Sequence, residues 1–356
     1  MHVLFPELVT KLKNKKLDRR EFMRLSGLLG VSAASATFLA GLPSPLQASS
    51  TVPKRGGELV VGSEWVKLKP PHEANYIEHQ IYRNICEFLV IIDADNVARP
   101  FLLKKWVASD DLKTWDLILN KGIKFSHGAE LTADDVIYNF KELWMHPDTT
   151  STLKRTFGAY LKKENIEKID RYTVRLHLDS AQIIIPEHLA MNQAAILPKD
   201  YDGKFIDNPV GTGPYTLEEY IPDERCVLKR REGYWRNGSD GKALPYLDGL
   251  RFVNVGTEVS AMTAALSSGQ VHVNRVYPAY LDLLKGTDIV VGGKPSGGTN
   301  VIRMRADKAP FDNIKVRQAL KAAMNRQLMF RNIMRGYGEL GEDFHVSPVH
   351  PEYAKI

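Results

Sequence analysis

The sequence predicts a mixed fold of short strands and helices, of the α/β (mixed α+β) class. Stretches in which apolar and polar residues alternate, as in half-buried strands, lie between stretches with helical spacing. The two kinds of segment do not alternate strictly, and no internal repeat or low-complexity tract is present, which favours a mixed architecture. The 308 residues after position 48 are enough for about two domains and a large core.

The expected strands are short and are bounded by turn signals. In residues 172–178, for example, apolar side chains occupy every second position, and the Asn120-Lys121-Gly122 triplet closes another strand with a tight turn. We expect strands at residues 58–62, 88–92, 106–108, 114–119, 172–178, 215–220, 225–230, 250–255 and 299–305. The tryptophans within and next to these segments, Trp106, Trp115 and Trp144, are expected in the core.

The expected helices carry apolar residues at helical spacing and recognisable ends. One contains Ile77, Ile81 and Ile85. Another covers residues 133–144, with Thr132 as N-cap and Asp135 three residues on, a variant of the capping box. A third covers residues 258–267 and is closed by Gly269, and the last follows Asp312 with an apolar stripe of Val316, Ala319, Leu320 and Ala323.

The N-terminal segment predicts export. Arg19 and Arg20 form a twin-arginine pair, a mildly apolar run covers residues 25–42, and Ala48 follows two prolines at the expected cleavage point. Asp18 stands where the twin-arginine consensus prefers Ser or Thr. We therefore expect a twin-arginine signal peptide at residues 1–48, the translocase of that route as a partner, and a periplasmic mature protein. The alternative is a marginal N-terminal membrane anchor.

The charge of the chain is concentrated in this segment. Residues 1–48 carry 7 Lys/Arg and 3 Asp/Glu, so they hold four of the six net positive charges. The remainder has 41 basic and 39 acidic side chains, which argues against nucleic acid as a partner.

The two cysteines, Cys86 and Cys226, lie in an apolar helical run and in a strand pattern. An oxidising compartment permits a disulfide between them, and two buried free thiols are the alternative that we favour.

Four blocks of the mature chain resemble the family 5 solute-binding proteins of ABC importers, which include dipeptide, oligopeptide and nickel receptors. Residues 100–144 carry the family's Ser-x-Asp turn, Lys-Gly-x-Lys-Phe turn and Thr-Ala-x-Asp-Val helix. Residues 208–215 (NPVGTGPY), 234–249 and 309–326 (APFDNIKVRQALKAAMNR) follow in the family's order. Asn325 replaces the family's usual Asp, and 304–306 (MRA) replaces Phe-Asn-Thr.

This resemblance implies a periplasmic binding protein-like class II fold, with two lobes joined by a hinge and the second lobe incomplete. Lobe one would hold residues 55–300, with a subdomain at about 90–200. Residues 301–356 would form the start of lobe two. Family members are longer, so we expect the segment that completes lobe one to be absent and apolar edges to be exposed.

The resemblance also implies a function. The protein would bind a di- or oligopeptide between its lobes and deliver it to an inner-membrane ABC permease complex, without covalent chemistry or a cofactor. The family uses the loop after its first strand, here Ser63-Glu64-Trp65, to contact ligand. Glu64 would meet an ammonium group and Trp65 would pack on the ligand. Arg303 and Arg305, on one face of a strand, would bind a carboxylate, unless that face is solvated.

Other functions remain open at this point. Oligosaccharides or nickel chelates could occupy the same fold, since the mature chain has ample Tyr and Trp. A secreted hydrolase is the rival class, but no nucleophile elbow, zinc-protease motif or paired-Cys spacing is present, and we expect no metal site. A phosphate cradle at Gly211-Thr212-Gly213 lacks a following Lys-Ser/Thr and a helix, so we expect these glycines to serve an unusual turn.

Overall fold

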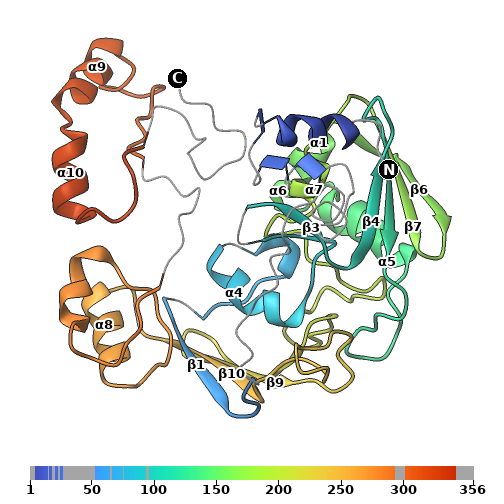
Figure 1. Ribbon diagram of the computed structural model, residues 1–356, viewed down its shortest axis with the longest axis horizontal. Helices are drawn as coiled ribbons and strands as arrows, with labels where there is room; N and C mark the ends of the chain where they lie inside the picture. Colours follow the sequence, from blue (N-terminus) through green and yellow to red (C-terminus); the bar gives the residue numbers. More distant parts are fainter. Residues whose placement is uncertain are drawn as a thin grey trace.

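The computed structural model describes residues 5–14, 16–17, 21–22, 25–26, 53–64, 66–74, 76–93, 96–292 and 301–341 (Figure 1). It has the mixed α/β class that the sequence predicts. Two four-stranded sheets, a small two-stranded sheet and the helices around them form the main body.

The first sheet has the order β1-β10-β9-β8. Strands β1 and β10 run parallel, although almost 190 residues separate them, and the other pairs are antiparallel. Cys226 and Leu228 of β9 lie opposite Phe252 and Leu250 of β10, and all four are buried on one face of the sheet. The strands are β1 (Glu58–Ser63), β8 (Tyr215–Ile221), β9 (Arg225–Arg230) and β10 (Gly249–Asn254).

The second sheet is antiparallel throughout and has the order β4-β5-β7-β6. Its strands are β4 (Leu103–Ala108), β5 (Thr114–Leu119), β6 (Leu161–Asp170) and β7 (Thr173–Leu178). The helices α5 (Ala133–Tyr138) and α6 (Thr152–Gly158) pack against it, and the short pair β2 (Val90–Ile92) and β3 (Ala98–Pro100) lies beside α7 (Ile185–His188). Trp106, Trp115 and Trp144 are each at most 1% exposed, which confirms that they are core residues.

The helix expected at residues 133–144 is confirmed, with a change of winding. Thr132 is its N-cap, and the Asp135 carboxylate accepts a hydrogen bond from Thr132 N at 2.8 Å. After α5 the chain continues as a π-helical turn, η2 (Asn139–Trp144). The buried Asn139 amide donates to Leu197 O at 2.6 Å and accepts from Leu197 N at 3.1 Å. This side chain therefore ties the helix to a distant segment at the point where the winding changes.

Helix α4 (Tyr76–Ile85), preceded by the short η1 (Pro71–Glu73), joins the two sheets. Its buried Ile81, Tyr82 and Ile85 belong to one continuous apolar core that includes residues of both four-stranded sheets. At its end the Ile85 carbonyl accepts a hydrogen bond from Gly213 N at 2.8 Å. Both glycines of the Gly-Thr-Gly segment therefore lie directly against the last turn of α4.

This contact, and not the unusual turn expected from the sequence, explains the two glycines. Neither Gly211 nor Gly213 has a positive φ, so an unusual turn does not require them. A Cβ on Gly211 would instead lie 2.1 Å from Ile85 O, and one on Gly213 would lie 2.6 Å from the same oxygen. The Gly213 amide is already used by Ile85 and the Gly211 amide by Ser126 Oγ, at 3.4 Å, so these amides do not form a phosphate cradle.

Cys86 and Cys226 are both buried and free. This finding agrees with the alternative of two buried thiols. Burial raises the pKa of both thiols, that of Cys226 to about 12, so neither is poised to react at neutral pH.

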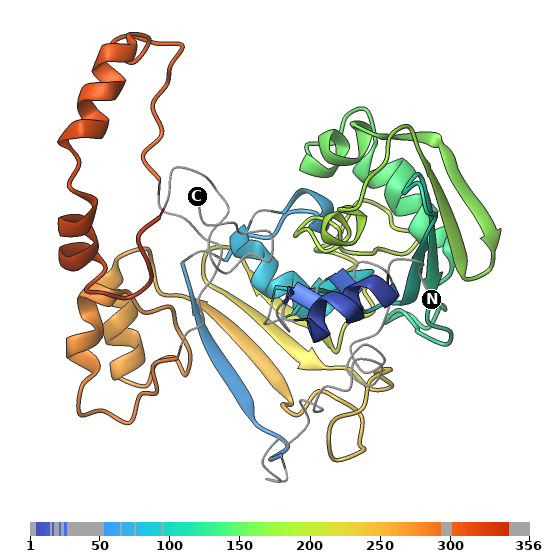
Figure 2. The same cartoon turned by 45° about the horizontal axis from the view of Figure 1, so that its top comes forward.

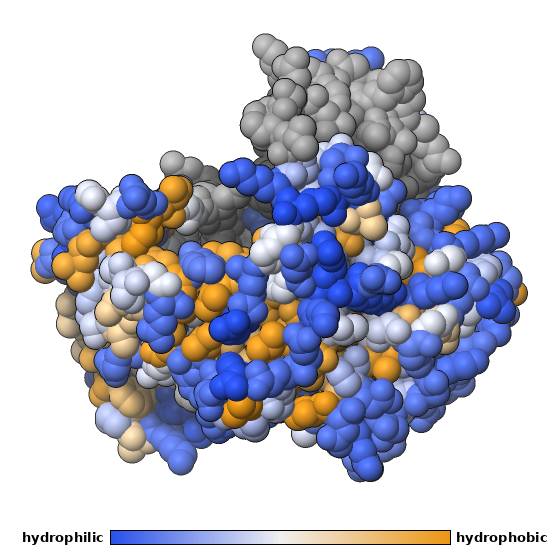
Figure 3. Space-filling view, turned by 90° about the horizontal axis from the view of Figure 1, so that it is seen from below, coloured by the Kyte–Doolittle hydropathy of each residue, from blue (hydrophilic) through white to orange (hydrophobic). Residues whose placement is uncertain are grey.

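A smaller unit follows β10. Helix α8 (Val259–Ser267) and the 3-10 turn η3 (Pro278–Leu284) enclose a second apolar cluster of Ala265, Leu266, Val271 and Leu284. Val60 of β1 packs against this cluster, which attaches the unit to the first sheet. Seen from below, apolar residues gather on the part of the surface nearer α8 and β1, and hydrophilic residues cover most of the rest (Figure 3).

Helices α9 (Ile314–Ala323) and α10 (Arg326–Ile333) lie on the same side of the molecule as α8, opposite the second sheet (Figures 1 and 2). Neither contains a buried residue. The apolar stripe predicted on α9 is therefore present in the sequence but is not packed, and Leu320 is 43% exposed. Asn313 caps this helix, because its side chain accepts a hydrogen bond from Lys315 N at 2.9 Å.

The expectation of a strand at 299–305 is wrong for its described part. Residues 301–305 are irregular and pair with no strand among the described residues. An extended segment without a partner leaves its backbone groups to water, so alternation in the sequence is not enough to form a strand there.

The N-terminal helix α1 (Phe5–Lys13) lies within the predicted signal peptide, before its twin-arginine pair. Arg19, Arg20 and Ala48 lie outside the described residues, so the export signal stays a prediction. Within the part of the chain that the structure describes, no helix combines the length and the apolar content needed to cross a membrane.

We predict that Gly211→Ala destabilises the protein by roughly 1–3 kcal/mol or more, because the new methyl group must displace the end of α4. Urea unfolding followed by circular dichroism measures this change. Gly158→Ala is the matched control, since a Cβ there meets nothing within 4 Å and the position lies in α6. Equal stability of the two variants would contradict the close approach.

Candidate functional site

Three segments converge at the carboxyl end of β1. Strand β10 runs parallel to it on one side, and residues 271–273 run along its other edge. On that edge Gly62 N donates to Val273 O and His272 N donates to Val60 O, both at 2.8 Å. Ligands of open α/β sheets bind outside the carboxyl ends of parallel strands. The loop that follows β1, which the sequence analysis also selected, is therefore the candidate site.

Ser63 is fixed within this loop and is not presented to a ligand. It is 3% exposed, and its hydroxyl accepts a hydrogen bond from Gln80 Nε2 of α4 at 2.7 Å. Its carbonyl accepts from Val255 N at 2.9 Å. Ser63 thus connects the ends of β1 and β10 to α4 and positions the residue that follows it.

Glu64 has two neighbours from the segment after residue 273. Tyr277 Oη donates to Glu64 Oε1 at 3.3 Å, and Arg275 Nη1 lies 4.0 Å from the same oxygen. The Arg275 guanidinium also lies over the Tyr277 ring, 4.8 Å from its centroid. Glu64 is about one quarter exposed, so a ligand would meet a carboxylate that already has partners.

The sequence analysis missed Arg275 and Tyr277. Tyr277 is 213 positions from Glu64, and nothing in the local pattern links them. Only the parallel course of residues 271–273 beside β1 brings the two segments together.

The other predicted site residues are not assembled with Glu64. Trp65 lies outside the described residues. Arg303 and Arg305 do not lie in a strand, so the inference that they share one strand face is wrong. Arg305 instead forms two hydrogen bonds with Asp307, at 2.6 and 2.8 Å, and both side chains are exposed.

A buried carboxylate helps to hold the end of α4. Glu87, 2% exposed, follows α4 and accepts hydrogen bonds from Tyr234 Oη and, at 2.8 Å, from Trp235 Nε1. Burial raises the pKa of Glu87, and these hydrogen bonds to the carboxylate oppose that shift. The neighbouring Arg231 donates to the carbonyls of Gly211 and Lys124 at 3.0 and 2.6 Å. The end of α4 is therefore held by polar as well as apolar contacts.

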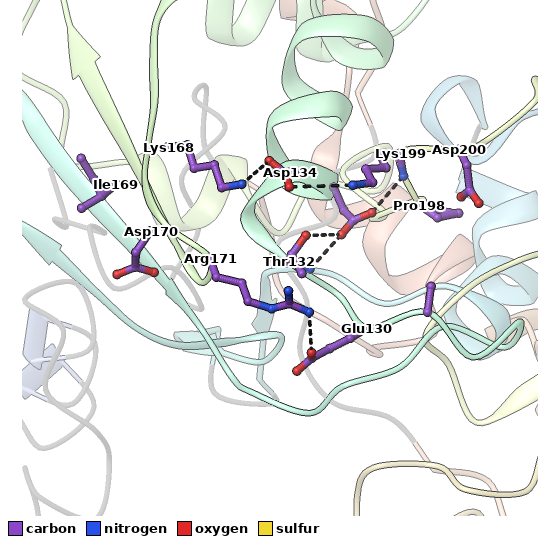
Figure 4. Close-up of a pocket in the computed structure, with 12 residues that line it drawn as sticks. Glu130, Thr132, Asp134, Lys168, Ile169, Asp170, Arg171, Pro198, Lys199 and Asp200 are labelled. Carbon is purple, nitrogen blue, oxygen red and sulfur yellow. Dashed lines mark hydrogen bonds and ion pairs between the residues drawn. The ribbon is translucent and has the colours of Figure 1, made fainter.

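A hollow lies elsewhere among the described residues. A cavity of about 540 Å³ opens beside α5 and the β6–β7 turn, and its lysine and arginine side chains pair with Asp134 and Glu130 (Figure 4). Lys168 bonds Asp134 at 2.7 Å, and Arg171 bonds Glu130 at 2.9 Å. Across the described residues, no set of three or more His, Cys, Asp or Glu side chains is arranged to hold a metal ion.

Comparison with known proteins agrees with the resemblance seen in the sequence. Residues 98–356 match the model of the bacterial extracellular solute-binding proteins, family 5. The chain belongs to this family. It is 31% identical over 304 residues to the glutathione-binding protein GsiB of Salmonella choleraesuis, covering 83% of this chain and 57% of that protein. It is 28% identical over 268 residues to the di/tripeptide-binding protein 3 of Pseudomonas aeruginosa, covering 68% and 49%.

Solved structures give the same fold. The periplasmic binding protein DppA of Helicobacter pylori, in complex with the peptide STSA, matches with a TM-score of 0.69 and 25% identity, over 80% of this chain and 59% of that one. The oligopeptide-binding protein AppA of Bacillus subtilis matches with a TM-score of 0.70 and 23% identity, over 86% and 61%. The family 5 chain thus spans roughly three fifths of the length of these proteins, and an incomplete second lobe agrees with that share.

Helix α4, which positions Gln80 against Ser63, also holds a buried histidine. His79 is 4% exposed, and its Nε2 accepts from Arg83 Nε. Burial, and then the charge of Arg83, lower the pKa of His79 from 6.5 to about 3. As the pH falls, the imidazole of His79 is therefore protonated in the unfolded chain before it is protonated in the folded protein. The free energy of unfolding that is present above pH 6.5 is thus lost progressively toward pH 3.

We predict that the free energy of unfolding falls between pH 7.5 and pH 5, and that His79→Gln reduces this fall by roughly 1–2 kcal/mol. Urea unfolding at the two pH values measures it. Burial also lowers the pKa of His72 and His188, so some dependence on pH should remain in the variant. The exposed His146 offers the control His146→Gln, which should behave as the wild type does. An unchanged pH dependence in His79→Gln would contradict the assignment.

Proposed function

We propose that this chain is the ligand-binding component of an ABC importer and that its ligands are di- or oligopeptides. Membership of a solute-binding family supports a binding role, and no covalent step is part of the proposal. The observation that carries the peptide assignment is the similarity to proteins that are named for glutathione, di- and tripeptides, together with a solved relative that holds a peptide.

The ligand would lie at the carboxyl end of β1, in contact with the Ser63-Glu64-Trp65 loop. Ser63, at the start of this loop, is held by β10 and α4, which would present the neighbouring Glu64 in one arrangement. Arg303, exposed and at the start of the α9–α10 unit, remains a candidate for a contact from the other lobe. The division into lobe one at 55–300 and lobe two from 301 is part of the same proposal. It is supported by the continuous core of the first part and the unpacked helices of the second.

Binding in such a protein is a shift between open and closed arrangements. A peptide that contacts both lobes only when they are closed favours closure by its difference in affinity for the two states. The permease complex would then recognise the closed form. Backbone hydrogen bonds to an extended peptide would let side chains vary, as in strand addition.

Ligand binding should raise the thermal stability of the purified full chain by mass action, by about 2.7 kcal/mol when the ligand is at 100 times its Kd. We expect a shift in the unfolding midpoint with dialanine, trialanine or reduced glutathione. Cellobiose and nickel–histidine should give none, and they test the sugar and nickel alternatives. A response to cellobiose or nickel–histidine alone would overturn the peptide assignment, and turnover of a peptide would overturn the binding role.

We also propose that the chain is exported by the twin-arginine route and works in the periplasm. Replacing Arg19 and Arg20 by Lys keeps the charge but removes the pair that this route requires, so the precursor should remain in the cytoplasm. Cell fractionation followed by immunoblotting measures this. Replacing Lys15 and Lys16 by Arg is the matched control and should leave export unchanged. Export of the Arg-pair variant at the wild-type level would exclude the route.

A further inference from the structure

Arg275 is a largely exposed charge at the carboxyl end of β1. Its side chain is 67% exposed, whereas that of the neighbouring Glu64 is 27% exposed. A solute that approaches this end of the sheet therefore meets the guanidinium first. Arg275 also lies two residues after Val273, which is hydrogen-bonded to β1, so its backbone is attached to the same sheet end.

The guanidinium is held in place from two sides. It lies over the face of Tyr277, 4.8 Å from the ring centroid, in the geometry of a cation–π contact. The hydroxyl of the same ring donates to Glu64 at 3.3 Å, so the ring that carries Arg275 is itself fixed to the loop after β1. Arginine stacked in this way loses little freedom when it binds an acceptor.

The N–H groups of Arg275 remain open to such an acceptor. Its nearest approach to Glu64 is 4.0 Å, which is longer than a hydrogen bond, and its side chain donates no hydrogen bond to another described residue. The guanidinium carries five N–H donors whose fork matches a carboxylate. Arg305 differs, since it already forms two hydrogen bonds with Asp307.

We propose that Arg275, at the carboxyl end of β1, binds a carboxylate of the ligand. It would therefore select peptides that have a free carboxylate terminus. This inference rests on the proposed peptide-binding function. Arg275, which lies beside the loop after β1, thus takes the carboxylate-binding role that the sequence analysis gave to Arg303 and Arg305. Glu64 then acts through Arg275 and Tyr277, as the residue that holds them in position.

The test compares trialanine with its C-terminal amide, which lacks the carboxylate, by isothermal titration calorimetry on the full chain. The wild type should bind the acid at least about tenfold more tightly than the amide, as a charge-assisted pair would give. Arg275→Gln should weaken binding of the acid by about 10- to 100-fold and leave the amide within about threefold, so that the preference disappears. Arg275→Lys should restore the preference for the acid only in part, because lysine can neither stack on the ring nor form two parallel hydrogen bonds as arginine does.

Arg251→Gln is the matched control, because Arg251 is an exposed arginine of β10 that pairs with Glu58 away from this end of the sheet. It should keep the wild-type preference. Thermal unfolding of Arg275→Gln should match the wild type, since the side chain is exposed. A preference that survives in Arg275→Gln, or that is lost in Arg303→Gln instead, would overturn the inference while peptide binding stands. Failure of the wild type to bind either form of trialanine would contradict the proposed function, and this inference with it.

Discussion

The close contact between the end of α4 and the Gly-Thr-Gly segment is the constraint on which the rest of the fold depends. The two four-stranded sheets share no strand, and α4 contributes to a core that includes residues of both. Its last carbonyl is bonded to Gly213 N, at a separation that no side chain at Gly211 or Gly213 would allow. Glu87 then closes the junction with two hydrogen bonds from Tyr234 and Trp235.

The same junction determines where the candidate site lies. Because α4 is fixed at its end, Gln80 in its middle can hold Ser63, and Ser63 in turn fixes the start of the loop that carries Glu64. The candidate site thus depends on the buried contact between Gln80 and Ser63. The support of the candidate site is therefore buried, whereas its proposed contacts, Glu64 and Arg275, are partly or largely exposed.

Features that depend on local sequence could be predicted, and features that depend on a distant partner could not. Two such local features are the capping box of Thr132 and Asp135 and the alternation of β7. Each depends on a few consecutive residues, and both are confirmed. The place of the site after β1 came from the family resemblance. The pairing of Glu64 with Tyr277 had no local signal, because it arises from a parallel course of two segments 213 positions apart. The strand expected at 299–305 had the right alternation, but its described part, residues 301–305, has no neighbouring strand among the described residues.

The run of residues 271–273 along β1 has a mechanical consequence. Two hydrogen bonds at 2.8 Å and the bridge between Val61 and Val273 join it to the strand that ends in the binding loop. Of the described residues after Asn274, η3 packs with α8 against β1, whereas α9 and α10 contain no buried residue. Because residues 271–273 are bonded to β1 in this way, any displacement of that segment would also displace the strand from which the loop of Glu64 starts.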